Sequence, residues 1–307
     1  MASINLKQLE AFVQVADLGS FRRAASRLNT TQPNISARIA TLEGQLGVVL
    51  MQRDAGSVRL TPKGDLLLTK ARKVLRATEE FIEAAGDEAL FDGMLRLGVT
   101  EMIVHSWLGT YLRALKDRFP NVLIDLTVDL SANLSPALFD RAIDLTLQSG
   151  PFSRQISGLV DLGSYPMIWV ASPSLGLGGR PLSLADISAH PVLTHARGTL
   201  PYDQLSEHIA FATTSASGTR VRLVPSTNMA ACLQMTVDGL GIACLPAAMV
   251  QRELCAGLLE PLHYPWLPDE LSFAARYDVD TAPSYMGQVA LIARDIAGDF
   301  AARTIAG

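Results

Sequence analysis

The apolar positions near the N-terminus recur at helical spacing. Steps of three and four residues predict a first helix that ends near Gly19, with the apolar positions Leu6, Leu9, Phe12, Val13 and Ala16. A second helix is expected over 21–28 with Ser20 as its N-cap. A third helix starts after Thr31 and carries Pro33 in its first turn, where a missing N–H does no harm. Its buried stripe consists of Ile35, Ile39, Leu42 and Leu46.

The opposite face of the third helix is small and weakly polar. It carries Pro33, Ala37 and Thr41, so this helix can approach another surface closely. Two short strand-like runs over 50–60, separated by the turn 54–57, predict a β-hairpin wing. Thr61 and Pro62 then mark the start of a long helix that continues to about Phe91.

From Met94 onward, strands alternate with helices. This order predicts βαβ units with a parallel sheet, and thus an α/β fold for the larger part of the chain. A helix is expected over 105–119, and a last helix over 284–303. The expected strands are 95–99, 122–128, 143–147, 165–171, 191–195 and 241–245.

The composition is that of a folded globular protein: hydrophobic residues make up 49% of the 307 residues, and charged residues 18%. No apolar run reaches the roughly 18 to 20 residues of a membrane span. The N-terminus also lacks an export signal, so we expect a cytoplasmic protein without a membrane partner. Cys232, Cys244 and Cys255 form no CxxC pair, which favours buried structural thiols over a redox switch or a metal site.

The charge is unevenly distributed along the chain. Residues 1–76 hold 12 Lys and Arg against 5 Asp and Glu, a net charge of +7. The remaining residues hold 14 against 25, a net charge of −11. A basic first quarter predicts a polyanionic partner.

Two helices joined by a tight turn and followed by a wing have the layout of a helix-turn-helix whose second helix enters the major groove. The residue pattern of this region resembles the N-terminal signature of LysR-type transcriptional regulators. It is carried by Phe12, Val15, Gly19, Ser20, Phe21, Ala24, Ala25, Leu28, Thr31, Gln32, Pro33, Ser36, Ile39, Leu42, Glu43, Leu46, Gly47, Leu50, Arg53, Leu60, Thr61, Pro62, Lys63 and Gly64. The segments 143–151 and 228–246 also resemble this family. Ala37 departs from it, because many members have a basic residue there, and Met51 replaces a usual Phe.

The resemblance implies three parts. Residues 1–61 are a winged helix-turn-helix domain with helices and a β-hairpin wing, and 62–92 are a linker helix that mediates dimerisation. Residues 93–307 are an α/β effector domain shaped like a periplasmic binding protein. Its lobe I covers about 93–165 and 266–307, and its lobe II about 166–265.

The expected DNA contacts lie on the helix pair, the wing and the start of the linker helix. Gln32 and Asn34 carry amides that can bond an adenine edge, and Pro33 can contact a thymine methyl. A Gln32 amide that caps the helix and faces water is the alternative. Phosphate or groove contacts are expected from the basic side chains and flanking hydroxyls. The full candidate set is Arg22, Arg23, Thr31, Gln32, Pro33, Asn34, Ser36, Arg38, Arg53 and Lys63.

A heptad seam on the linker helix predicts homodimerisation, against the alternative that this stripe packs on its own domain. The seam consists of Leu67, Ala71, Val74, Thr78, Phe81 and Ala85. A two-fold pair of winged helices predicts duplex DNA with dyad symmetry. The resemblance further implies a dimer of dimers, with RNA polymerase as a further candidate partner.

By the same resemblance, a small-molecule effector binds between the lobes, where strand ends and helix N-termini meet. The candidate residues are Thr100, Glu101, Ser131, Gln148, Ser149, Arg197, Thr199, Ser226 and Thr227, each of which can instead be an N-cap. Glu101 either disfavours a dicarboxylate or faces solvent. With Arg197 as the basic residue of these loops, a mono-anionic or zwitterionic metabolite is expected.

The sequence has no HExxH, GxSxG or GxxxxGK[ST] motif, so no catalytic residue, metal or cofactor is predicted. The predicted function is a DNA-binding transcriptional regulator controlled by a small molecule. The alternative is a small-molecule binding protein or enzyme whose N-terminal helices serve only oligomerisation.

Overall fold

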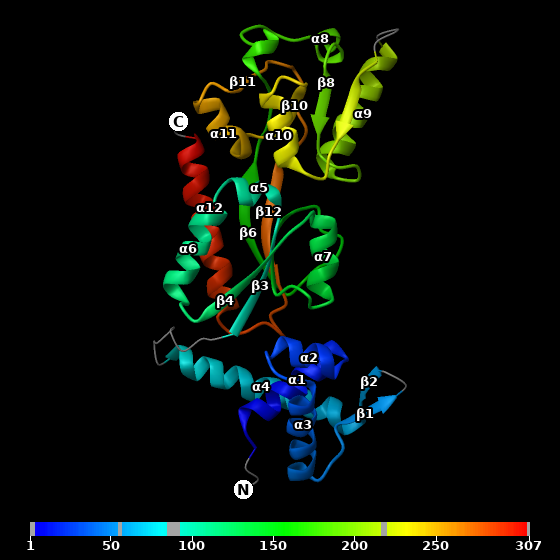
Figure 1. Cartoon of the computed structure of the whole chain (residues 1–307), viewed down its shortest axis with the longest axis vertical. Coiled ribbons are helices and arrows are strands. Elements are labelled where there is room, and N and C mark those ends of the chain that lie inside the picture. Colours follow the sequence, from blue (N-terminus) through cyan, green and yellow to red (C-terminus); the bar gives the residue numbers. More distant parts are fainter. Residues whose placement is uncertain (1–3, 55–56, 85–92, 216–219, 306–307) are drawn as a thin grey trace.

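The computed structural model describes residues 4–54, 57–84, 93–215 and 220–305. Three parts follow one another along its long axis: a helical N-terminal unit, a first α/β lobe and a second α/β lobe (Figure 1). The N-terminal unit contains α1 (Leu6–Leu18), α2 (Phe21–Arg27), α3 (Gln32–Leu46), β1 (Met51–Asp54), β2 (Ser57–Leu60) and α4 (Pro62–Ala84).

Local signals set the ends of the N-terminal helices. Ser20 caps α2, because its side chain accepts a hydrogen bond from the Arg23 N–H, and Thr61 caps α4 by accepting one from the Gly64 N–H. Gly19 ends α1 in the left-handed region at a φ of +62°, a conformation that other residues seldom adopt. Thr31 occupies the N-cap position of α3 as expected, but its side chain makes no capping hydrogen bond.

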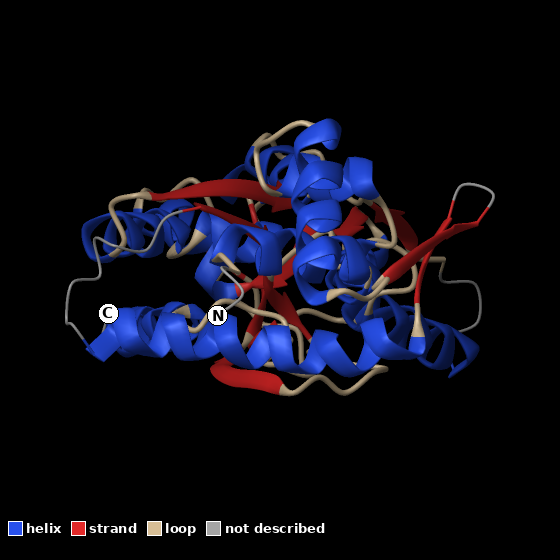
Figure 2. Ribbon diagram, turned by 90° about the horizontal axis from the view of Figure 1, so that it is seen from below, coloured by secondary structure: helices blue, strands red, loops and turns tan. Residues whose placement is uncertain are grey.

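The N-terminal unit has its own hydrophobic core. Phe12, Ile35 and Leu42 are fully buried at its centre, where α1, α2 and α3 meet. The β1–β2 hairpin pairs antiparallel and projects from the side of the helices (Figure 2). These elements form the winged helix-turn-helix that the sequence predicts.

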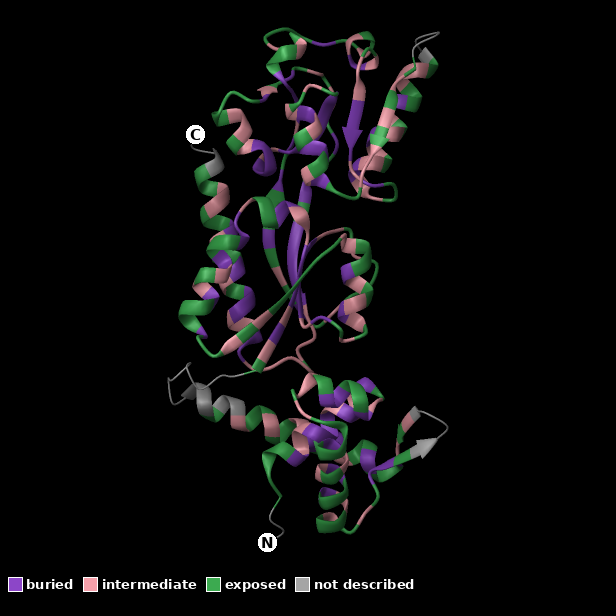
Figure 3. Cartoon of the chain, in the orientation of Figure 1, coloured by how far each residue is buried: buried purple, intermediate pink, exposed green. Residues whose placement is uncertain are grey.

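The first lobe is built around a five-stranded sheet in the order β4-β3-β5-β12-β6. Its strands are β3 (Gly93–Val99), β4 (Val122–Val128), β5 (Leu145–Ser149), β6 (Gly158–Tyr165) and β12 (Leu271–Tyr277). Its helices are α5 (Glu101–His105), α6 (Leu108–Arg118), α7 (Ser131–Phe139) and α12 (Met286–Ile305). Buried residues line β3, β5 and β12, the three inner strands of this sheet (Figure 3).

The second lobe has a sheet in the order β11-β7-β10-β8-β9. Its strands are β7 (Met167–Ala171), β8 (Pro191–Thr194), β9 (Arg222–Pro225), β10 (Ile242–Pro246) and β11 (Glu260–Pro261). Its helices are α8 (Leu184–Ser188), α9 (Leu200–Ser215), α10 (Met229–Val237) and α11 (Ala247–Cys255), with a 3-10 turn at Pro173–Leu175.

Both sheets are mixed, so the expectation of a parallel sheet is wrong in part. β3 runs parallel to β4 and β5, and β8 runs parallel to β9 and β10. In contrast, β12 runs antiparallel to β5 and β6, and β7 runs antiparallel to β10. The cause is the path of the chain, which leaves the first lobe after β6 and returns through β12.

Candidate functional site

Helix α3 presents its small face to solvent. Gln32, Pro33, Asn34 and Thr31 at its start are exposed, whereas Ser36 and Arg38 are half-buried. The opposite face packs into the core through Ile35, Ile39 and Leu42. The burial pattern confirms the predicted orientation of the helix, and the green residues of Figure 3 show its exposed side.

The two amides at the start of α3 differ in their contacts. The Asn34 Nδ2 donates a 3.2 Å hydrogen bond to the Thr30 Oγ1. Within the described part of the chain, the Gln32 side chain makes no hydrogen bond and stays available to a partner. An exposed amide on a narrow helix face can donate to and accept from the edge of a base.

The wing is held against α3 by one carboxylate. The Glu43 Oε1 accepts hydrogen bonds from the Leu50 N–H at 2.7 Å and the Met51 N–H at 3.2 Å. Arg53 lies on β1 opposite Val58, but its side chain is outside the described residues. Lys63 is exposed in the first turn of α4, beside the wing.

The arginines of α2 divide between solvent and the first lobe. Arg22 is exposed. Arg23 donates to the Asp140 carbonyl oxygen at 3.3 Å, and Arg27 forms an ion pair with Asp144. Asp17 of α1 joins the same region by pairing with Arg72 and Arg141. We call these contacts of Asp17, Arg23 and Arg27 the junction. It was not predicted, because each contact joins residues more than 50 positions apart.

The predicted heptad seam is shared between two environments. Leu67 and Ala71 pack into the core of the N-terminal unit, and Ala71 is only 5% exposed. Val74 and Phe81 are 48% and 76% exposed, while the Thr78 hydroxyl bonds to the Val74 carbonyl oxygen within the helix. Ala85 lies outside the described residues. The accessible part of the seam therefore begins at Val74.

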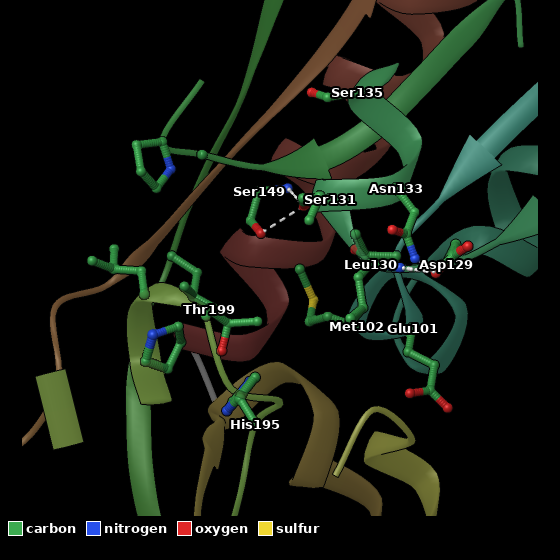
Figure 4. A pocket seen from close by; sticks show the side chains of 18 of the residues that line it. Glu101, Met102, Asp129, Leu130, Ser131, Asn133, Ser135, Ser149, His195 and Thr199 are labelled. Carbon is green, nitrogen blue, oxygen red and sulfur yellow. Dashed lines mark hydrogen bonds between the residues drawn. The ribbon is translucent and has the colours of Figure 1, made fainter. Parts of the chain in front are cut away.

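A cavity of about 1110 Å³ lies between the two lobes (Figure 4). Its wall comes from the ends of β3, β5 and β8 and from the starts of α5, α7, α9 and α10. Six of the predicted effector residues line it, namely Thr100, Glu101, Ser131, Ser149, Thr199 and Thr227.

Three predicted effector residues do not line the cavity. Gln148 is fully buried, with its side-chain amide 3.1 Å from the Ser135 Oγ. Arg197 is exposed outside the cavity, and the Ser226 Oγ is engaged in its own turn by the Asn228 N–H. Gln148 does not line the cavity because it precedes Ser149 on β5, and neighbouring side chains of a strand point to opposite faces.

Several polar residues of the cavity were not among the predicted effector residues, including His195 and Arg154. His195 directly follows β8. Its position at the end of a predicted strand is the signal from which it could have been predicted. Burial lowers the pKa of His195 to about 4, so its ring is neutral at pH 7. Within the described structure, the His195 Nδ1 and the Thr100 Oγ1 are buried without a hydrogen-bond partner. Both residues line the cavity, so a ligand bound there can bond to these two atoms.

Arg154 lines the cavity beside the last residue of α7. Its guanidinium stacks over the Phe139 ring at 3.7 Å. Behind it, Arg276 is 1% exposed, and its guanidinium carbon lies 4.3 Å from the centroid of the Phe152 ring. Burial lowers the pKa of Arg276, which nevertheless stays positively charged at neutral pH. The cavity thus has a cationic and aromatic end.

Glu101 is half-buried in the cavity wall and bonds across the cleft. Its carboxylate accepts hydrogen bonds from the Met229 N–H at 2.5 Å and the Ala230 N–H at 3.5 Å, because the start of α10 faces α5 and supplies N–H groups. The sequence did not predict this link between the lobes, and the expectation that Glu101 disfavours a dicarboxylate stays a prediction.

The cysteines are dispersed in the second lobe. Cys232 and Cys244 are buried, Cys255 is exposed, and none is in a disulfide. Burial raises the pKa of Cys232 and Cys244, so both remain protonated thiols at neutral pH. Among the described residues, no helix could span a membrane, and no three His, Cys, Asp or Glu side chains gather as metal ligands do.

A winged helix-turn-helix joined to a two-lobed domain around a cavity defines the class of DNA-binding regulators that respond to small molecules. Family comparisons agree with this class. Residues 6–65 match the bacterial regulatory helix-turn-helix protein of the lysR family, and residues 88–285 match the LysR substrate binding domain. The chain belongs to the family of LysR-type transcriptional regulators, whose members regulate transcription and are not enzymes.

Individual relatives support the same assignment. A probable hydrogen peroxide-inducible genes activator of Streptomyces viridosporus is 31% identical over 81% of this chain and 80% of its own. The HTH-type transcriptional regulator CzcR of Bacillus anthracis is 25% identical over 92% of this chain and 93% of its own. The crystal structure of ArgP from Mycobacterium tuberculosis shares the fold with a TM-score of 0.61, at 20% identity over 94% of this chain and 96% of that one.

Proposed function

We propose that this regulator reads a DNA operator with dyad symmetry through α3 and the wing. The observation that carries the proposal is the exposed, unpaired Gln32 amide on the small face of α3. Thr31, Pro33, Asn34, Ser36 and Arg38 surround it, while Arg22, Arg53 and Lys63 supply charge for phosphates. Arg23 and Arg27 contribute less in this conformation, since both are engaged in the junction.

The regulator acts as a homodimer through α4. Val74, Thr78 and Phe81 form the accessible part of the seam, and the exposed Phe81 needs an apolar partner. A second copy supplies one by symmetry. A dimer of dimers, contact with RNA polymerase and a cytoplasmic location follow from the family and belong to the same proposal. The division into 1–61, 62–92 and 93–307 is the corresponding set of domains.

The cavity between the lobes is the effector site. Two orphaned polar atoms, the Thr100 Oγ1 and the His195 Nδ1, support this role. Arg154 supplies one positive charge at the wall, which suits a mono-anionic or zwitterionic metabolite better than a multiply charged anion.

Helix α7 connects this cavity to the DNA-binding unit. Its first residue, Ser131, bonds to the Ser149 N–H at 3.1 Å in the cavity wall, and its C-cap residue Asp140 accepts the hydrogen bond from Arg23. A ligand that moves Ser131 therefore acts on a helix whose other end contacts Arg23 of the junction. This short route complements a change in the spacing of the linker helices.

A peroxide response is the second candidate, because several relatives bear the name of peroxide-inducible activators. Two of the three cysteines do not favour it. Cys232 and Cys244 are buried and protonated, whereas a peroxide-reactive cysteine needs an accessible thiolate. Cys255 is exposed and is the cysteine that a peroxide response would have to use.

Capture of genomic DNA from the source organism tests the proposal. Fragments retained by the purified chain are sequenced, and the enriched sites are expected to share two half-sites related by a dyad. The Q32A variant is expected to lose enrichment at one base pair of each half-site while its sedimentation mass is unchanged. Recovery of random fragments would show that α3 does not read sequence.

A further inference from the structure

The N-terminus of α10 is already occupied by side chains of the protein itself. Its first two N–H groups, those of Met229 and Ala230, donate to the Glu101 carboxylate. The third, that of Ala231, donates to the Asn228 Oδ1 at 2.7 Å. The Cys232 N–H already belongs to the helix, because it donates to the Asn228 carbonyl oxygen at 3.3 Å. All the N–H groups that a helix start can offer to an anion are used.

Glu101 comes from the other lobe. It stands in the first turn of α5, directly after β3, whereas α10 belongs to the second lobe. A carboxylate at a helix N-terminus is stabilised by both hydrogen bonds and the helix dipole. The contact therefore ties the lobes together and fills the position in which a bound anion is expected at such a helix.

The same end of the cavity holds a second carboxylate. The Asp129 Oδ1 accepts hydrogen bonds from the Leu130 N–H at 2.7 Å and the Asn133 Nδ2 at 2.8 Å, just before α7. Asp129 and Glu101 lie near each other in the cavity wall (Figure 4). Asp203, in the first turn of α9, is a further acid of the cavity lining. Among the described lining residues, Arg154 is the one lysine or arginine, and it stacks on Phe139. The end with Glu101 and Asp129 therefore repels anions.

The positive groups lie toward the other end of α7. Arg154 stacks on Phe139, the last residue of that helix, and Arg276 is close behind. At 1.5 Å per residue, the nine residues of α7 separate the acidic and the cationic ends by about 13 Å. The cavity is electrically polarised, although Asp140 adds one acid at the cationic end.

We propose that Glu101 is the built-in anion of this cleft, which links the lobes and reserves the acidic end for a positively charged group of the effector. The effector then carries an ammonium or guanidinium group near Glu101 and Asp129, and any carboxylate it has faces Arg154. This inference rests on the proposed role of the cavity as the effector site, and it excludes a purely anionic ligand.

Hydrogen–deuterium exchange of the full-length protein tests the link between the lobes. In E101A, the amides at the start of α10 are expected to exchange about tenfold faster, because a charge-assisted hydrogen bond is lost. Sodium acetate is expected to restore their protection in E101A and to leave the wild type unchanged. E207A removes an exposed carboxylate of α9 and serves as the control. Wild-type exchange rates in E101A, or an equal effect of acetate on both proteins, would overturn the proposal.

A matched pair of probes tests the charge preference. Propylammonium chloride and sodium propionate are compared at equal ionic strength, with sodium chloride as reference. Propylammonium is expected to slow exchange of the wild-type segments 129–135 and 228–233 about twofold, and propionate to have no effect. Protection by propionate alone would refute the charge preference but keep the cavity as the effector site. Protection by neither probe would count against the cavity as that site, and hence against both proposals.

Discussion

The exposed face of α3 and the wall of the cleft use polar side chains in opposite ways. On α3, the Gln32 amide has no hydrogen-bond partner in the described structure and meets water. In the cleft, Ser131, Asp129 and Glu101 already bond to neighbouring groups. The α3 surface can bind DNA without breaking a hydrogen bond of the Gln32 side chain. In the cleft, a ligand that bonds to these side chains must replace hydrogen bonds within the protein.

This difference suits the two tasks. A rigid helix on a well-packed core reads bases without rearrangement, since its orientation is set by Ile35 and Leu42. A cleft whose lobes are held by internal hydrogen bonds can change shape when a ligand replaces them. We therefore expect DNA recognition by this chain to be preorganised, and effector recognition to be coupled to a conformational change.

The largest expected effect is at the junction between these two regions. D144A removes the partner of Arg27, whose side chain is 16% exposed, and leaves a nearly buried guanidinium unpaired. Loss of one member of a buried ion pair costs about 3 kcal/mol in the free energy of unfolding. Urea unfolding measures this loss. A change below about 0.5 kcal/mol would show that the junction does not hold the two regions together.

The next effect is on the preorganised wing. A Cβ at Gly64 would lie 2.0 Å from the Leu50 carbonyl oxygen, so G64A must displace α4 from the wing. We expect a loss of about 2 to 3 kcal/mol in the free energy of unfolding. G44A is the matched control, because open space surrounds Gly44 on α3 and alanine favours the helix by about 0.5 to 1 kcal/mol. Equal effects of the two variants would contradict this description of the wing.

Q32A tests the reading surface itself. It is expected to cost about 1 to 3 kcal/mol of binding free energy at one base pair of the operator, because one direct contact to a base is removed. Fluorescence anisotropy with single-base operator variants measures the cost. Uniform weakening on all sequences, including random DNA, would assign Gln32 to the DNA backbone.

The cleft is expected to respond to pH through His195. Its folded pKa of about 4 lies below the unfolded value, so the unfolded chain binds a proton first as the pH falls. The stabilisation is complete above the unfolded pKa, near 6.5, and declines toward pH 4. We expect a loss of about 1 to 2 kcal/mol in the free energy of unfolding between pH 7 and pH 5. Urea unfolding of H195N is expected to lack this component.

The smallest effect separates two threonines. The Thr61 hydroxyl caps α4, so T61V is expected to lose about 1 kcal/mol in the free energy of unfolding. The Thr100 hydroxyl has no partner, so T100V is expected to change the free energy of unfolding by less than about 0.5 kcal/mol. Thermal unfolding compares the two. A larger loss in T100V than in T61V would mean that the Thr100 hydroxyl already has a structural role.

Local patterns predicted the parts of this molecule that depend on neighbouring residues. The caps at Ser20 and Thr61 and the buried stripe through Ile35 are set within a few positions of the chain. The cavity-lining positions at the ends of β3 and β5 were predicted in the same way, because a strand end is a local signal. Gln148 was predicted at the effector site but is buried away from the cavity, because the face to which a strand residue points depends on the register of the sheet.

The contacts that could not be predicted join distant segments. Glu101 meets Met229 across 128 positions, and Arg27 meets Asp144 across 117. The antiparallel placement of β12 also depends on where the chain crosses between lobes. Such contacts depend on tertiary packing, which periodicity and capping signals do not encode.

The dependence of operator affinity on salt shows whether α3 and the wing bind duplex DNA specifically. Anisotropy titrations with an operator recovered from the genomic capture are made at several salt concentrations, for wild type and Q32A. We predict a specific complex whose affinity falls steeply and linearly in a double-logarithmic plot, with the same slope for Q32A at lower affinity. An affinity that does not change with salt, or no specific complex at any concentration, would contradict this prediction.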